Sequence, residues 1–251
     1  MDYPTSGNIV VWKAGMMKGN LFGDVFGEIG GLPCRAWIVM CLFGIVMAGA
    51  DVLGWSSGPG LSSIDYVSAS ITAPLGLFAA YFAGMSMVSR RVSGLSFLRF
   101  IFGVFSLFSF LIIGIGSILV LLPSPYKGII LTVALTLIFF GWLALAFLPS
   151  WPIAQALSSK LVSPTRLFHG TKGHRGSLFL IFFVGGSFNN LVPSTAAAKS
   201  LGEAMVYAVG NSAVSVFTIT LFVALSVTAW RYASANDKTL YGDEPRAAGV
   251  F

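Results

Sequence analysis

The side chains able to do chemistry in this chain are few, and they lie at the ends of apolar stretches or between them. Asp51 lies about one helical turn inside the end of one stretch, and it is the best candidate for an outward-facing ion or proton contact. The alternative is an acid whose side chain simply reaches the membrane interface. His169 and His174 share one basic segment, and Cys34 and Cys41 are the only cysteines. An ionisable residue at the centre of a membrane span usually marks function because its burial is costly, and no stretch has one there.

These residues do not assemble into a recognisable reaction centre. The two histidines have no neighbouring cysteine or carboxylate to complete a metal site, and no histidine lies in an apolar stretch where it could ligate haem. The cysteines form no CxxC pair and are read as packing residues or free thiols. We therefore expect no catalytic residue, no cofactor, no metal ligand and no enzymatic activity.

Six nearly uncharged stretches make up most of the chain: 36–55, 66–89, 100–122, 128–148, 176–192 and 204–230. A helix of roughly 20 apolar residues, rising about 1.5 Å per residue, covers the ~30 Å hydrocarbon core of a bilayer. The 251 residues are 56% hydrophobic and 10% charged, whereas soluble domains carry about 25% charged residues. The sequence predicts an all-α polytopic membrane protein, a bundle of six transmembrane helices.

The basic residues predict how these helices are oriented. All but two of the 15 Lys and Arg residues lie in the amino-terminal arm, the second and fourth loops and the tail; the exceptions are Lys127 and Lys199. Because cytoplasmic loops retain Lys and Arg, both termini are predicted to be cytoplasmic. We expect a cytoplasmic arm over 1–35, the bundle over 36–231 and a cytoplasmic tail over 232–251, in a bacterial inner membrane. The net charge of +6 is attributed to contact with anionic lipids, with no nucleic-acid partner.

The arm carries apolar residues at helical spacing, at Phe22, Val25, Phe26 and Ile29. This pattern predicts a short amphipathic helix lying in the membrane interface. Two alternatives are that a partner protein orders the arm and that the arm is disordered. Residues 1–35 lack the pattern of a cleavable signal peptide, so we expect the first span to be retained.

Small residues at intervals of four predict two surfaces where helices approach closely. One belongs to the second span, in which Pro74 predicts a kink, and the other to the sixth. Their members are Gly76, Ala80 and Gly84, and Ala204, Ala208 and Ser212.

The fifth span is the least regular, because Gly185, Gly186, Asn189 and Asn190 precede Pro193. One interpretation is a short helix whose polar end reaches the interface. The other is a helix broken within the membrane, as in transporters whose broken helices line a binding site. A polar cavity between spans one, five and six would hold Asp51, Asn189, Asn190 and Asn211.

The fourth loop is the most distinctive polar segment, since it is basic, contains no acid and has apolar anchors such as Leu167 and Phe168. This composition suits an interfacial segment that binds lipid phosphates, or a surface for an acidic partner. The candidate contacts are Lys160, Arg166, Lys172 and Arg175. Positive-inside topology alone would also explain these charges.

This loop also carries a resemblance, through Pro164, Thr165, Arg166, Phe168, Thr171, Lys172, Gly173 and Arg175, followed by an apolar helix from Gly176. The arrangement resembles the midpoint of six-span proteins that include the YIP1-like membrane proteins and the membrane domain of some glycerophosphodiester phosphodiesterases. The resemblance implies a six-helix, mostly non-catalytic membrane fold.

Two functions follow from these expectations. The first is a non-catalytic accessory or structural subunit of a larger inner-membrane complex, whose partners are membrane lipids and other membrane subunits. The alternative is a transporter or lipid-handling protein that uses the polar cavity. A membrane enzyme would need a nucleophile or metal site that the residues do not provide.

Overall fold

The computed structural model describes residues 20–57, 63–121, 127–237 and 240, and every regular element within them is helical. The helices are α1 (Leu21–Gly30), α2 (Cys34–Ser56), α3 (Ser63–Met87), α4 (Gly94–Leu121), α5 (Lys127–Phe147), α6 (Trp151–Leu157), α7 (Pro164–Gly170), α8 (Arg175–Ser187) and α9 (Leu201–Asn236), with short 3-10 turns η1 (Phe188–Asn190) and η2 (Thr195–Ala197) between α8 and α9.

Five of the described helices are long and apolar enough to cross a membrane: α2, α3, α4, α5 and α9. Large apolar side chains are exposed along their lengths, as expected of helices that face lipid. The chain is therefore a multi-pass membrane protein. The fifth predicted span, 176–192, is shorter than expected, because α8 has only 13 residues. The helix ends with Gly185, Gly186 and Ser187, directly before η1.

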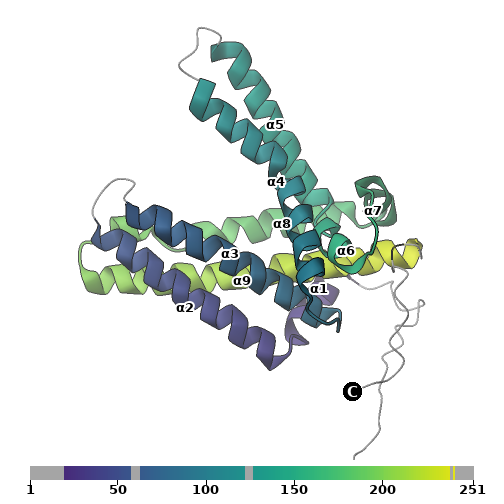
Figure 1. Cartoon of the computed structure of the whole chain (residues 1–251), viewed down its shortest axis with the longest axis horizontal. Coiled ribbons are helices and arrows are strands. Elements are labelled where there is room, and N and C mark those ends of the chain that lie inside the picture. The colour runs from purple at the N-terminus through teal and green to yellow at the C-terminus, as the bar shows by residue number, and fades with distance from the viewer. Residues whose placement is uncertain (1–19, 58–62, 122–126, 238–239, 241–251) are drawn as a thin grey trace, which may run out of the picture.

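Four helices form an elongated body, in which α2, α3 and α8 run beside the long helix α9 (Figure 1). One end of this body, called here the basic end, holds α1, α6, α7 and the carboxyl end of α9. The opposite end holds the carboxyl end of α2 and the amino end of α9. Most Lys and Arg residues of the described loops lie in segments 88–93 and 158–175, which belong to the basic end.

Helix α9 supplies the centre of the body, with buried side chains along most of its length from Ala204 to Ser234. Its first turn is capped on both sides. Ser200 Oγ accepts a hydrogen bond from the Glu203 amide at 3.3 Å, and the Glu203 carboxylate accepts one from the Lys199 amide at 2.7 Å. This reciprocal arrangement satisfies amide groups that the first turn of a helix leaves unpaired.

Helices α4 and α5 form an antiparallel hairpin that leaves the body at a steep angle (Figure 1). Glycines allow the two helices to approach closely, because a Cβ at Gly114 would lie 3.0 Å from the Ala134 carbonyl oxygen and one at Gly141 would lie 2.7 Å from Leu111 Cγ. The hairpin is anchored at its base, where a Cβ on Gly103 would lie 2.7 Å from Pro152 Cα of α6.

The predicted arm helix is present as α1, and within the described residues it packs against protein. Leu21 and Val25 are buried at the basic end, where α1 lies against α9, while Phe26 is 54% exposed. Asn20 caps the helix by accepting a hydrogen bond from the Phe22 amide at 3.2 Å. The remainder of the predicted arm, residues 1–19, lies outside the described residues.

Candidate functional site

A large cavity opens in the angle between the body and the hairpin. Its volume is about 1310 Å³, above the range of roughly 300–1000 Å³ typical of small-molecule sites. The lining comes from α2, α3 and α4, with contributions from η2 and α9: Phe43, Met47, Ala50, Asp51, Gly54, Trp55, Ser68, Ala69, Thr72, Ala73, Gly76, Leu77, Ala80, Val104, Phe105, Phe108, Ile112, Thr195, Ala196 and Ile219. We call this cavity the groove.

Small side chains on α3 create the space. Ala69, Ala73, Gly76 and Ala80 recur along the groove face of this helix, and Ala73 is exposed. A Cβ on Gly76 would lie 3.2 Å from the ring of Phe43, so the α2 wall approaches closely at that level. Helix α3 continues through Pro74, which is not part of the lining.

The two ends of the groove differ in polarity. Asp51, Trp55, Ser68, Thr72 and Thr195 lie toward the opposite end of the body, because they occupy the last turns of α2, the first turns of α3 and the turn η2. The walls nearer the basic end are apolar, with Phe43, Leu77, Ala80, Val104 and Ile219. The groove therefore has a more polar end, called here its mouth, and an apolar remainder, called its interior.

Among the described residues of the lining, Asp51 is the single ionisable one, and none is Lys, Arg or His. Its side chain is partly buried, and no hydrogen bond or ion pair joins its carboxylate to another described residue. Trp55 lies one turn further along α2, and its indole N–H donates a 3.2 Å hydrogen bond to the Ala198 carbonyl. The indole is thus held in place while one of its surfaces lines the groove.

The irregular chain between α8 and α9 covers this polar mouth. Phe188 packs its ring against Phe217 at a centroid separation of 5.6 Å, and the Asn211 side chain donates a 3.2 Å hydrogen bond to the Pro193 carbonyl. From Asn211 back to Leu201, α9 rises by about 15 Å at 1.5 Å per residue. Segment 188–200 therefore runs along the first turns of α9 and reaches Trp55, bringing Thr195 and Ala196 into the lining.

The structure differs from the predicted polar cavity both in its position and in the residues that line it. Asp51 lines the groove, but the groove lies mainly between α2, α3 and α4 instead of between spans one, five and six. Asn211 holds the backbone of the covering segment, and Asn190 is exposed in η1; neither lines the groove. Asn189 also belongs to η1, and its side chain lies outside the described part of the structure.

The predicted packing surfaces lie at helix contacts. Ala204 and Ala208 are fully buried, and Ser212 Oγ donates a 2.6 Å hydrogen bond to the Gly44 carbonyl of α2. A Cβ on Gly84 would lie 2.6 Å from Ile153 Cδ1, where α3 meets α6. Gly76 and Ala80 instead line the groove, so the second-span stripe serves both packing and the cavity.

The basic fourth loop is folded as α6, α7 and their connections. Lys160, Arg166 and Lys172 are exposed at the basic end, within reach of a ligand or headgroup. Arg175 is partly buried; its guanidinium donates a 2.7 Å hydrogen bond to the Phe168 carbonyl and lies 3.5 Å from the centroid of the Phe168 ring. Arg175 therefore stabilises the end of α7.

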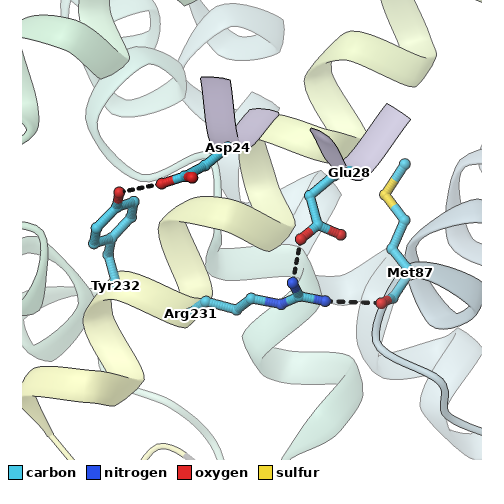
Figure 2. A network of polar contacts seen from close by, with 5 residues as sticks. All are labelled: Asp24, Glu28, Met87, Arg231 and Tyr232. Atoms are coloured by element: carbon cyan, nitrogen blue, oxygen red, sulfur yellow. Dashed lines mark hydrogen bonds and ion pairs between the residues drawn. The ribbon is translucent and has the colours of Figure 1, made fainter. Parts of the chain in front are cut away.

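A polar network that the sequence did not reveal fixes α1 to the body (Figure 2). Arg231 of α9 pairs with Glu28 and donates a 2.8 Å hydrogen bond to the Met87 carbonyl at the end of α3. The next residue, Tyr232, donates its hydroxyl to Asp24. Asp24 and Glu28 are four residues apart on one helical face, and this spacing was the available signal.

One pattern associated with nucleophilic catalysis does occur, since residues 54–58 read Gly-Trp-Ser-Ser-Gly, a GxSxG match. In hydrolases the serine of this motif sits on a strained turn between a strand and a helix. Here Ser56 is the last residue of α2, and its hydroxyl donates a 2.7 Å hydrogen bond to the Leu53 carbonyl. His169 and His174 lie at the basic end, so these residues do not form a triad.

Among the described residues no group of three or more His, Cys, Asp or Glu side chains is placed to hold a metal ion. Cys34 and Cys41 are free and exposed on α2. No protein-family model, curated protein or solved structure matches this chain. The resemblance to the YIP1-like proteins and phosphodiesterase membrane domains therefore stays a prediction, and function is argued from the groove itself.

Proposed function

We propose that this chain is a non-catalytic, multi-pass membrane protein that binds an amphiphilic molecule in the groove between α2, α3 and α4. The observation that carries the proposal is the polarity of the groove: a carboxylate and hydroxyl groups at its mouth and an apolar interior. An amphiphile has the same division into a polar head and an apolar tail.

The geometry also suggests how such a molecule would enter. The hairpin stands away from the body (Figure 1), and the groove lining runs along α2, α3 and α4 and includes exposed residues such as Ala73 and Phe105. A lipid-soluble molecule would reach the groove from the bilayer, with its head near Asp51 and its tail toward Phe43 and Val104. Aromatic rings of Phe43 and Phe105 would contact the tail.

The proposal includes a topology with both termini in the cytoplasm of a bacterial cell. Helix α8 starts at the basic end, and segment 188–200 continues to the amino end of α9 at the opposite end. Together they would complete a sixth crossing. Irregular backbone is tolerated at membrane depth where protein buries it or where it lines a cavity, which fits the position of Thr195 and Ala196.

The test is a groove-filling substitution. Ala73→Phe places a large ring into the lining, whereas Ser70→Phe places the same ring on an exposed position of the same helix outside the lining. The purified chain in lipid nanodiscs is titrated with a fluorescent amphiphile, and energy transfer from its tryptophans is measured. Saturable transfer that Ala73→Phe abolishes and Ser70→Phe preserves supports the proposal. Transfer that rises linearly with probe in all three proteins contradicts it.

A second candidate is the accessory subunit of a larger membrane complex, favoured by the hairpin. Helices α4 and α5 expose large apolar side chains outside the groove lining, including Phe110, Phe139 and Phe140. A neighbouring membrane subunit could pack on this surface, and the exposed basic residues Lys160, Arg166 and Lys172 could contact lipid headgroups beside it. Native mass spectrometry distinguishes the two candidates: a stoichiometric protein partner lost on Phe140→Ala supports the subunit, whereas a lone chain with bound amphiphile supports the first proposal.

A further inference from the structure

We propose that the groove is selective for a cationic amphiphile, a molecule with an ammonium-type head and an apolar body, and that Asp51 is its counter-ion. This inference rests on the proposed function, because it names the chemical class of the molecule that the groove binds.

The charge of the lining favours a cation. Asp51 contributes one carboxylate, and no basic side chain among the described lining residues offsets it. The carboxylate has no hydrogen-bond or ion partner among the described residues, so within that part of the chain it is available to a ligand. A fatty acid would place a second negative charge beside Asp51, and a zwitterionic headgroup would leave its phosphate without a cation in the groove.

The mouth also offers a surface for a cation. Trp55 lies four residues after Asp51 on α2, so the two side chains occupy adjacent turns of one helical face. The Trp55 N–H is already bonded to Ala198, which fixes the indole as a wall of the groove. Tryptophan is the best aromatic surface for a cation, and the attraction strengthens as the site loses water.

One hydroxyl at the mouth is already engaged. The Thr72 hydroxyl donates a 2.9 Å hydrogen bond to the Ser68 carbonyl on its own helix, so its proton is not available to an anionic head. The Ser68 and Thr195 hydroxyls can each donate or accept, so they fit a cationic head as acceptors. Among the described lining residues, only the Asp51 carboxylate carries a charge that distinguishes a cationic head from an anionic one.

Inside a membrane, the polar head of an amphiphile determines which amphiphile binds most tightly. Lipid tails are as apolar as the walls of the groove, so moving an alkyl chain from the bilayer into the groove yields little free energy from the hydrophobic effect. Discrimination between amphiphiles must come from the polar end and from the fit of the apolar body. An ion pair between a cationic head and Asp51, in surroundings less polar than water, would supply this discrimination.

The experiment compares two probes that differ by one cationic group: trimethylammonium-diphenylhexatriene and its uncharged parent, diphenylhexatriene. The full chain is placed in nanodiscs of zwitterionic lipid, and the saturable part of the energy transfer from tryptophan gives each affinity. We expect the cationic probe to bind about tenfold more tightly than the neutral one, equivalent to ~1.4 kcal/mol.

Three variants test the role of Asp51. Asp51→Asn removes the charge and should reduce the cationic preference to about onefold while leaving the neutral affinity unchanged. Asp51→Glu should restore the preference. Glu203→Gln is the matched control, because it removes one negative charge at the same end of the body from a residue outside the lining, and it should change neither affinity.

The outcomes separate the two proposals. Equal saturable binding of both probes, or a cationic preference that survives Asp51→Asn, overturns the counter-ion inference and leaves the amphiphile groove standing. If neither probe binds saturably while the protein stays monodisperse and helical, both proposals fail. A loss of the cationic preference in Glu203→Gln would also overturn the inference, since the charge effect would then not be local to the groove.

Discussion

Ser212 Oγ donates a 2.6 Å hydrogen bond to the Gly44 carbonyl, and this contact joins the middle of α9 to the middle of α2. The two helices approach closely because Gly44 has no side chain: a Cβ there would lie 3.0 Å from Ser212 Oγ and 3.0 Å from Val216 Cγ2. Small residues at such crossings give membrane helices their packing energy. The contact also holds the α2 wall of the groove in register with α9.

Enlarging this glycine should loosen the body. Gly44→Leu forces a side chain between α2 and α9, and overpacking of this kind costs about 1–3 kcal/mol. Gly49→Leu is the matched control on the same helix, because a Cβ at Gly49 meets no atom within 4 Å. Thermal denaturation in detergent should show a lower midpoint for Gly44→Leu and an unchanged midpoint for Gly49→Leu. Equal midpoints would mean that α2 and α9 do not cross at Gly44.

The hydrogen bond from Ser212 to Gly44 should contribute less to thermal stability than the close packing of α2 against α9. Ser212→Ala removes the donor while keeping the small volume, and interhelical hydrogen bonds in membranes average about 0.6 kcal/mol with a maximum near ~1.7. We expect a small decrease in the same denaturation midpoint, below that of Gly44→Leu. A larger effect from Ser212→Ala would show that the contact acts through more than one bond.

A second glycine tests how α7 is placed at the basic end. A Cβ on Gly170 would lie 2.8 Å from Ala233 Cα of α9, and the Asn236 side chain donates a 2.6 Å hydrogen bond to the Gly170 carbonyl. Gly170→Ala should therefore displace α7 and make segment 158–175 more sensitive to limited proteolysis. Gly176→Ala, where a Cβ meets no atom within 4 Å, should leave the cleavage rate unchanged. Similar rates in both variants would argue against the α7–α9 contact.

The docking of α1 should depend on pH through Glu28. Burial raises the pKa of Glu28 above its usual 4.5, an effect that the Arg231 charge reduces and the Asp24 charge reinforces. A raised pKa in the folded state means that the folded protein binds the proton more tightly than the unfolded chain. The Glu28 contribution to docking is therefore fully present below pH 4.5 and is lost as the pH rises through the raised pKa.

Hydrogen exchange of residues 21–30, corrected for the intrinsic effect of pH on exchange, measures this dependence. Protection should increase as the pH falls from 7 toward 5, and Glu28→Gln should flatten the profile. The Glu28→Gln profile is the control for other groups, including Asp24 and Tyr232, that face the same interface. A decrease in protection on acidification would show that the ion pair with Arg231 outweighs burial.

Topology can be measured by labelling single cysteines in a background with Cys34→Ser and Cys41→Ser. His169→Cys lies in α7 at the basic end, and Lys199→Cys lies at the amino end of α9. We expect a membrane-impermeant maleimide applied to intact cells to modify the Lys199→Cys position and leave the His169→Cys position unmodified until the membrane is permeabilised. The reverse pattern, or modification of both from outside, would contradict the proposed six crossings.

Much of the fold follows from apolar runs in the sequence, because long uncharged stretches have no alternative to a membrane helix. The bounds of α2 and α5 lie within a few residues of the predicted spans 36–55 and 128–148. The helix predicted over 176–192 is shorter in the structure, where α8 ends at Ser187, because hydropathy alone does not locate the end of a helix. Irregular chain follows α8 along α9, and the proposed sixth crossing corresponds to the interpretation of a helix broken within the membrane.

Less of the groove than of the fold could be predicted from the sequence. Asp51 was identified because an acid within an apolar stretch is conspicuous. Ala69 and Ala73 are ordinary helix residues in the sequence, and only the arrangement of α3 and α4 shows that they line the groove. The hairpin leaves the body where Gly103 of α4 contacts Pro152 of α6, and these two residues lie far apart in the sequence. The Glu28–Arg231 pair was missed for the same reason, since charges in an arm and a tail give no sign of their partner.

Photo-crosslinking of an amphiphile in the membrane tests the central proposal most directly. A cationic amphiphile with a diazirine in its tail is activated in nanodiscs that contain the full chain, and the modified peptides are identified by mass spectrometry. The account predicts saturable labelling concentrated on the groove walls of α3 and α4, between Ala69 and Ala80 and between Val104 and Ile112. Labelling of the lipid-facing Phe139 and Phe140 of α5 to the same extent, with no saturation, would contradict it.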